Sequence, residues 1–152
     1  MLRLTRRSEY GLMALAFLAR RPGVYQCVRE IVEQLGLPRR LLAEVLKELA
    51  RAGLVEATRG PCGGYRLTRP ARTITLSQVV EALEGPLKLA ACQESGSCRW
   101  QPGCNIQEGV HALMHSIHAL LEEFNLESFV REDGEDPRRE PQEAAAISSQ
   151  SG

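Results

Sequence analysis

The stretch that decides the fold covers residues 28–67 and reads VREIVEQLGLPRRLLAEVLKELARAGLVEATRGPCGGYRL. Apolar residues return with helical spacing on both sides of Gly36, so the pattern predicts one helix over residues 28–35 and a second over residues 38–52. Pro38 suits the first turn of the second helix. Two helices joined by a short glycine-containing turn, the second with arginines near its start, are typical of a helix-turn-helix.

A hairpin is expected directly after this helix pair. Residues 53–58 read as one strand and residues 65–67 as its return. The turn between them, residues 59–64, reads RGPCGG and is both basic and rich in glycine. A hairpin with such a tip has the shape of a wing, so the stretch predicts a winged helix-turn-helix.

The flanking sequence completes this domain. Residues 5–20 read as a helix capped by Thr5 or Ser8. After the wing, residues 73–76 suggest a short strand, and Ser77 is expected to cap a helix that reaches Leu83 and stops at Gly85. We therefore predict a domain over residues 1–85 that is mainly α with a small β wing.

A long C-terminal dimerisation helix is expected within residues 105–130. Its apolar residues step by four and three over nearly three heptads. Such a stripe could bury itself on its own domain, but the winged domain accounts for its own core, so we expect pairing with a second chain. Residues 86–104 are expected to form a loop, and the charged, proline- and serine-rich residues 131–152 a disordered tail. The stripe consists of Ile106, Val110, Leu113, Ile117, Leu120 and Phe124.

Charge is distributed unevenly along the chain. Residues 1–74 hold 14 Lys and Arg against 6 Asp and Glu, whereas residues 75–152 hold 5 against 13. This asymmetry suggests that the N-terminal half faces a polyanion such as double-stranded DNA. No stretch approaches the roughly 18 apolar residues that a membrane span needs. Because the N-terminus also lacks a signal-peptide pattern, we expect a cytoplasmic protein with no membrane partner.

Basic residues and glycines of this half are the candidates for DNA contact. Arginines near the start of a recognition helix can offer a bidentate fork to a guanine edge, which points to Arg39 and Arg40. Lys47 lies further along and is expected to contact the phosphate backbone. At the wing tip, Arg59 can enter a minor groove. The glycines that would let the main chain approach closely are Gly60, Gly63 and Gly64. For each arginine the alternative is a solvated surface charge.

Five cysteines are present, and an odd number in a reducing compartment argues against a disulfide framework. Cys92, Cys98 and Cys104 stand apart, because thiolates are soft ligands suited to iron–sulfur clusters or zinc. Their two five-residue spacers favour a cluster, since structural zinc usually shows closer pairs and four ligands. Cys27 is expected at a helix start. Cys62 lies at the predicted wing tip and is expected to have no special role, with a redox role of its thiol as the alternative.

With these motifs the sequence resembles the Rrf class of bacterial regulators, which includes the IscR-like and NsrR-like iron–sulfur sensors. The resemblance covers about residues 2–130. It implies a homodimer whose recognition helices enter successive major grooves, whose wings reach minor grooves, and whose long helix crosses to the partner. The residues that carry it are Arg3-Leu4-Thr5, Glu30-Ile31 leading to Leu37, Gly53-Leu54-Val55, the wing motif RGPCGGY at residues 59–65, and the cysteine loop Cys92-x5-Cys98-x5-Cys104.

The resemblance implies three cysteine ligands and leaves a fourth position open. IscR-like members carry a histidine three residues after the last cysteine, where this chain has Gln107, a poor iron ligand. NsrR-like members can use an acidic residue of the other subunit's first helix, and Glu9 stands at the matching place. Glu9 is thus the first candidate, ahead of His111; the alternative for Glu9 is a carboxylate favoured by the helix dipole. Both cluster types are compatible, with 2Fe–2S preferred over 4Fe–4S.

Together these features predict a transcription regulator, a repressor or an activator, whose operator binding is controlled by an iron–sulfur cluster. The signal would be iron–sulfur status, redox state or nitric oxide. One alternative is a cluster-free regulator of the same fold, in which replacing the cysteines leaves DNA binding unaltered. Another is a winged-helix protein–protein interaction module, which steeply salt-dependent DNA binding would exclude. We do not expect an enzyme, because the sequence shows no nucleophile–base pair and no phosphate-binding loop.

Overall fold

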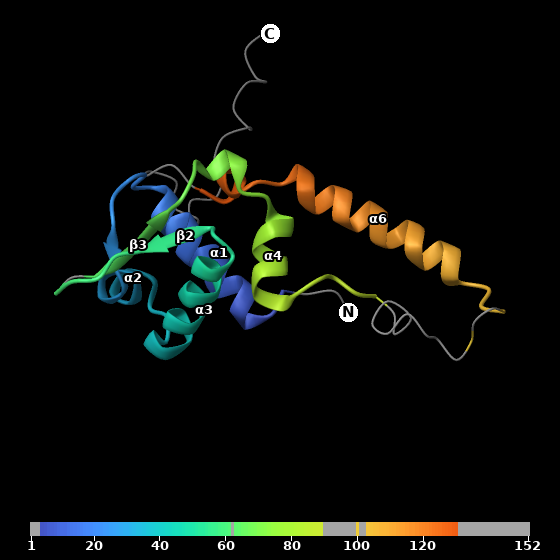
Figure 1. The fold of residues 1–152 in the computed structure, drawn as a ribbon, viewed down its shortest axis with the longest axis horizontal. Coiled ribbons are helices and arrows are strands. Elements are labelled where there is room, and N and C mark those ends of the chain that lie inside the picture. Colours follow the sequence, from blue (N-terminus) through green and yellow to red (C-terminus); the bar gives the residue numbers. More distant parts are fainter. Residues whose placement is uncertain (1–3, 62, 90–99, 101–102, 131–152) are drawn as a thin grey trace, which may run out of the picture.

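A computed structural model describes residues 4–61, 63–89, 100 and 103–130 of the chain. Within these ranges, helices cluster next to a small antiparallel sheet, and a long helix projects from that cluster (Figure 1). The fold is mainly α with a small β wing, as the sequence predicts. In chain order the elements are α1 (Arg6–Ala19), β1 (Gln26–Cys27), α2 (Val28–Leu35), α3 (Arg39–Arg51), β2 (Val55–Ala57), β3 (Gly64–Leu67), the 3-10 turn η1 (Ala71–Thr73), α4 (Leu76–Glu84), α6 (Gln107–Glu123) and the 3-10 turn η2 (Leu126–Phe129).

Helix α1 is the centre of the hydrophobic core. Its apolar residues pack against α3, α4, β3 and η2. Leu15 and Leu18 are among the most buried side chains, and Thr5 caps the helix by accepting a 3.3 Å hydrogen bond from the N–H of Ser8. Because a fully buried leucine contributes about 1.5–3 kcal/mol, this helix supplies much of the stability of the N-terminal half.

The predicted helix pair is confirmed. Helix α2 has the expected bounds and ends at Gly36, whose φ of 65° places it in the left-handed region that favours glycine. The N–H of Gly36 donates a 2.9 Å hydrogen bond to the carbonyl of Val32. Pro38 is the N-cap of α3 and not its first helical residue, so this boundary differs from the prediction by one position.

The wing is a three-stranded sheet in the order β1-β3-β2, and its third strand was not predicted. Strand β1 holds only Gln26 and Cys27, which is too short for any hydrophobic alternation. It pairs with Tyr65 and Gly64 of β3. A side chain at Gly64 would collide with the backbone of Gln26, so the close approach of these two strands requires glycine at this position.

The strand predicted over residues 73–76 is not formed. Pro70 precedes the 3-10 turn η1, and the extended segment that follows makes a single antiparallel bridge between Thr75 and Asn125. The prediction failed because the partner of this segment lies 50 residues further along the chain, beyond any local pattern.

Ser77 was also wrongly predicted as the cap of α4. The cap is Thr75, whose hydroxyl accepts a 3.3 Å hydrogen bond from the N–H of Gln78. The side chain of Gln78 accepts one of 3.2 Å from the N–H of Thr75 in return. This reciprocal capping box starts the helix two residues earlier and leaves Ser77 buried in its first turn.

The long helix predicted within residues 105–130 is interrupted. Helix α6 ends at Glu123, and Asn125 then caps η2 by accepting a 3.3 Å hydrogen bond from the N–H of Ser128. Leu126, in η2, is buried in the core. Figure 1 shows the C-terminal end of α6 beside α4 and its N-terminal end projecting away from the helices around the sheet.

Candidate nucleic-acid interface and cysteine loop

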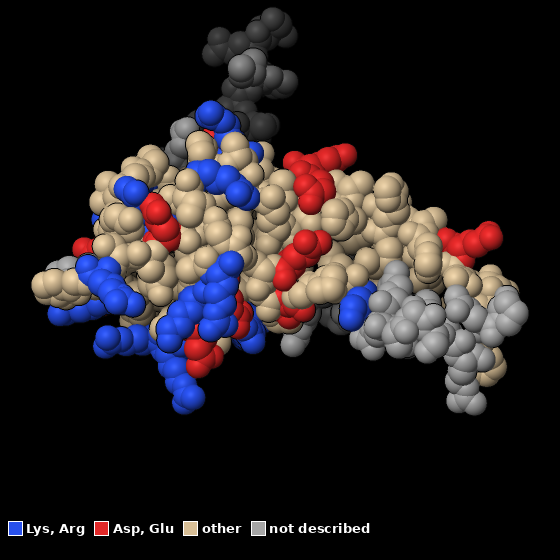
Figure 2. Space-filling model, viewed as in Figure 1, with Lys and Arg blue, Asp and Glu red and all other residues tan. Residues whose placement is uncertain are grey.

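Helix α3 presents a row of charged side chains on the face opposite its core contacts. Its buried residues, Leu42, Val45, Leu46 and Leu49, occupy one side of the helix. With about 100° of rotation per residue, the opposite side carries Arg40, Glu44, Lys47 and Arg51, all of which are exposed. Figure 2 shows Lys and Arg gathered over α3 and the wing, and Asp and Glu over α4 and α6. The charge asymmetry of the sequence is therefore an asymmetry in space.

Arg40 is the most prominent cation of this row. Its side chain is 94% exposed, and its Nε atom lies 3.4 Å from Oε1 of Glu44, one helical turn away. Arg39 is also exposed but lies about 100° around the helix, towards the flank. Arg40 is therefore better placed than Arg39 for a groove that this face enters.

The wing tip exposes Arg59 and Gly60. The N–H of Gly63 donates a 3.0 Å hydrogen bond to the carbonyl of Gly60, which closes the turn, and Gly60 has a φ of 146°. A side chain at Gly63 would sit 2.7 Å from the carbonyl oxygen of Thr58, so this turn also requires glycine. Gly63 is half-buried and Gly64 is buried, so the geometry explains these two glycines by packing, and their contact with DNA remains a prediction.

Arg66 holds the base of the wing in place, and no motif in the sequence pointed to this role. Its guanidinium lies over the ring of Tyr25, 4.5 Å from the centroid. It also donates to Glu56 across the β2–β3 pair and, over 3.1 Å, to the carbonyl of Gly23. Hydrogen bonding to Glu56 raises the pKa of Arg66. These contacts hold the hairpin against the segment between α1 and β1.

The predicted apolar stripe of α6 is partly buried and partly exposed to solvent. Val110 and Ile117 are partly buried, and α6 packs against α4. The other four members remain exposed: Ile106 by 61%, Leu113 by 53%, Leu120 by 53% and Phe124 by 45%. In the described part of the chain no residue of α6 is fully buried, so four of the six stripe residues have no cover there.

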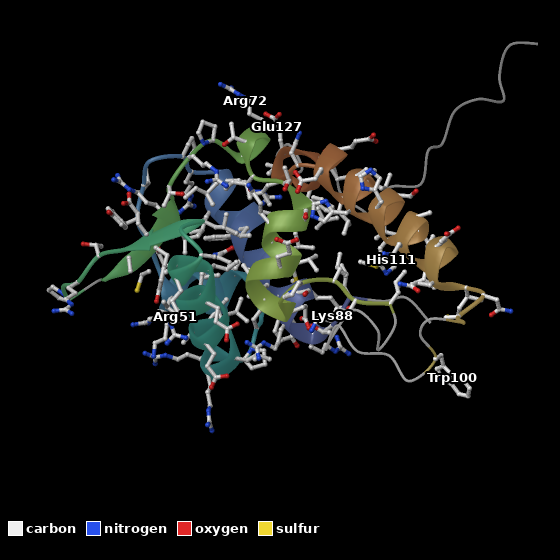
Figure 3. The ribbon with its side chains drawn as sticks, turned by 45° about the vertical axis from the view of Figure 1, so that its right-hand side comes forward. Arg51, Arg72, Lys88, Trp100, His111 and Glu127 are labelled. Atoms are coloured by element: carbon white, nitrogen blue, oxygen red, sulfur yellow. The ribbon has the colours of Figure 1, made fainter. Side chains whose placement is uncertain are left out.

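A histidine of α6 also contacts α4. The Nε2 atom of His118 lies 3.4 Å from Oγ of Ser77 and 3.3 Å from Oε1 of Glu81. These contacts join α6 to α4 beside the partly buried Ile117. Figure 3 shows His111, two turns earlier, on the same helix.

Of the predicted cluster ligands, the structure describes two. Cys104 is a free, half-buried thiol three residues before α6. Glu9 lies in the first turn of α1 with its side chain 44% exposed, 3.4 Å from the guanidinium of Arg6. Cys92 and Cys98, like Cys62 of the wing, lie outside the described residues, and so does the predicted tail.

The described residues contain no group of three or more His, Cys, Asp or Glu side chains that could hold a metal ion. Two of the three predicted thiolates lie outside these residues. The described part therefore places Cys104 and Glu9 one by one and does not test whether the predicted ligands come together. Among the alternatives for the fourth position, Gln107 is half-buried and His111 is exposed, both on α6. No helix in the described ranges is long and apolar enough to cross a membrane.

Comparison with known proteins identifies a family and several solved structures of the same fold. A family model named Rrf2, described as an iron-dependent transcriptional regulator, matches residues 4–132. IscR of T. potens is 28% identical with a TM-score of 0.64, over 84% of this chain and 85% of that one. CymR, described as the global cysteine regulator of B. subtilis, is 24% identical with a TM-score of 0.65, over 85% and 96%. The oxidized form of Staphylococcus aureus CymR is 22% identical with a TM-score of 0.63, over 86% and 98%.

Proposed function

Because the chain belongs to the Rrf2 family of iron-dependent transcriptional regulators, we propose that it binds operator DNA as a homodimer under the control of an iron–sulfur cluster. Members of this family are DNA-binding transcription regulators and not enzymes, and the chain is a regulator of this kind. The proposal adds the site of DNA contact, the dimer, and the cluster in residues 86–104 as the source of control. It places the protein in the cytoplasm, where cysteine thiols remain reduced.

The observation that carries the DNA-binding part is the exposed basic face of α3 beside the wing. Arg40, Lys47 and Arg51 project from the side of α3 that faces away from the core. An α-helix fits the major groove of B-form DNA, where an arginine can donate to O6 and N7 of guanine. Arg59 at the wing tip would reach the adjacent minor groove, while Lys47 and Arg51 would neutralise phosphates.

The dimer is supported by the uncovered edge of α6. Its exposed apolar side chains, Leu113 and Leu120, are seven residues apart and therefore lie on one line along the helix. Burying such side chains against a second copy would remove apolar area from water at about 25 cal/mol per Å². A two-fold axis would also match two recognition helices to two half-sites of an operator.

The cluster is supported by the chemistry and position of the donors. Cys104 is a free thiol at the C-terminal end of the predicted loop, and the Glu9 carboxylate lies 3.4 Å from the guanidinium of the exposed Arg6. Thiolates and a carboxylate are compatible ligands for iron in a cluster. Cys92, Cys98 and Cys104 would hold the cluster, with Glu9 of the other subunit as the fourth ligand. When bound, the cluster would supply a centre whose redox state and integrity respond to oxygen or nitric oxide.

A cluster-free regulator is the second candidate. It is favoured by Gln107, which is a poor iron ligand where IscR-like members carry histidine. The fold of CymR, described as a cysteine regulator, is also close to that of this chain. In such a regulator the three cysteines would not bind an iron–sulfur cluster.

One experiment separates the two candidates. The full-length protein is purified without oxygen, and its visible absorption, iron and sulfide are measured beside a variant with Cys92, Cys98 and Cys104 changed to Ala. The cluster proposal predicts a coloured protein with iron and sulfide and a colourless variant. A wild-type protein that stays colourless and free of iron after reconstitution would exclude it and leave the DNA-binding assignment intact.

A further inference from the structure

The first turn of α1 carries three consecutive polar residues that point in different directions. They are Arg7, Ser8 and Glu9, and an α-helix turns by about 100° from each residue to the next. Arg7 meets α3, and Ser8 meets α4. Glu9, the candidate cluster ligand, points elsewhere and contacts Arg6. One helical turn therefore touches the recognition helix and the helix from which the cysteine loop departs.

The link from α1 to α4 is a hydrogen bond from a buried hydroxyl to the side-chain carboxylate of the last residue of α4. Ser8 is fully buried, and its Oγ donates a 2.9 Å hydrogen bond to Oε1 of Glu84. The hydroxyl of Thr5 donates to the same oxygen. Glu84 is the last residue of α4, and residues 86–104 follow after Gly85. The start of the loop is thus fastened to the start of α1.

The link from α1 to α3 is an ion pair between Arg7 and Glu48. The guanidinium of Arg7 donates to Oε2 of Glu48, and this hydrogen bond raises the pKa of Arg7. The two side chains are 44% and 28% exposed, so the pair is partly shielded from solvent. Glu48 directly follows Lys47 of the outward row, which places this contact on the helix proposed to enter the major groove.

Apolar packing joins the same three helices one turn later. A Cβ atom built on Gly11 of α1 would collide with Cδ1 of Leu83 on α4, and it would lie 3.5 Å from Cγ1 of Val45 on α3. Glycine therefore lets the Leu83 side chain of α4 pack against the backbone of α1, at a point where Val45 of α3 is also close. Side chains in such a packed junction cannot shift independently, since protein interiors have few voids to absorb movement.

We infer that Arg7, Ser8, Glu48 and Glu84 form a relay through which the state of the cysteine loop changes the position of the recognition helix. The inference rests on the proposed function for its signal, but the mechanical connection is a property of the chain itself. Movement of the loop start would pull Glu84, and α1 would transmit that displacement to Glu48. None of the four is expected to touch DNA or the cluster, so all four are positioning residues.

The connection is tested by amide hydrogen exchange on the full-length protein as purified. In the variant Glu84→Ala, exchange should become about fivefold faster or more in the first turn of α1 and in α3 around Glu48, consistent with the lower range of coupling between sites. The matched control is Glu33→Ala, which removes a carboxylate paired with Arg29 over 2.7 Å inside α2 alone. It should leave α3 at the wild-type rate.

Faster exchange confined to α1 and the last turn of α4, with α3 unchanged, would overturn the relay. Ser8→Ala provides a second variant because it removes only the buried hydroxyl, and alanine is well tolerated in a helix. It therefore tests the link if Glu84→Ala fails to fold. Ser8→Ala should also speed amide exchange in α3, but by a smaller factor than Glu84→Ala.

A second readout separates the relay from the cluster. For DNA selected by the wild-type protein from a random pool, the affinity ratio between cluster-bearing and cluster-free protein should be about 5- to 150-fold in the wild type and below about twofold in Ser8→Ala, with an unchanged visible spectrum. An unchanged ratio in the variant would overturn the relay. A wild type without a cluster would instead refute the proposed function, and the exchange experiment would still decide the relay.

Discussion

The backbone N–H of Leu126 donates a 2.8 Å hydrogen bond to the carbonyl oxygen of Ile74, and both side chains are buried. Beside it, the N–H of Leu76 donates over the same distance to the carbonyl of Phe124. The segment after α6 is therefore attached to the start of α4. These hydrogen bonds hold the C-terminal end of α6 at the start of α4, and the N-terminal end projects away. They therefore help to set the orientation of the exposed apolar edge of α6 relative to α4.

Replacing Leu126 by Ala should destabilise the protein by about 2–5 kcal/mol, the usual cost of truncating a fully buried leucine. Urea unfolding at constant protein concentration measures this difference. Phe129→Ala is the matched control, since Phe129 lies in the same 3-10 turn but is 40% exposed. Equal losses in the two variants would contradict the assignment of Leu126 to the core.

Local sequence patterns predicted the elements whose causes are local. Helix α2 has its expected bounds because its apolar spacing and Gly36 act within a few residues. Strand β1 and the return of Leu126 escaped prediction because each depends on a partner far away in the chain. The exposed row on α3 followed from helical geometry. The contacts of Ser8 with Glu84 and of Arg7 with Glu48 did not, since spacing cannot show which helices pack together.

Arg40→Ala should weaken operator binding by about 1–3 kcal/mol, roughly 5- to 150-fold, if its guanidinium reads a base edge. Fluorescence anisotropy at fixed salt, with DNA selected by the wild-type protein, measures the change. Arg72→Ala is the control, because Arg72 lies in η1 and Figure 3 shows it well away from Arg51 of α3. If both variants lose affinity equally, α3 is not the reading helix.

Leu113→Glu combined with Leu120→Glu should convert the dimer to a monomer, because two carboxylates would be buried without partners in the apolar seam. Sedimentation equilibrium measures the mass directly. His115→Glu is the matched control, since His115 is exposed on a different face of α6. A double variant that remains dimeric, with helix content as in the wild type, would refute the proposed interface.

Glu9→Gln should retain the three cysteine ligands but lose the cluster faster in air, by about tenfold or more, as expected when metal-site partners are removed. The decay of visible absorbance after exposure to oxygen gives the rate. Arg6→Gln is the control, because it removes the ion-pair partner of Glu9 and leaves the carboxylate in place. A decay rate equal to that of the wild type would assign the fourth position to another group.

We propose that the state of the cysteine loop controls DNA binding by the α3 and wing face. The most direct test measures operator affinity before and after cluster removal, in the wild type and in the variant with Cys92, Cys98 and Cys104 changed to Ala. We predict a change of about 5- to 150-fold in the wild type and none in the variant. Equal affinities of the cluster-bearing and cluster-free wild type would contradict the claim.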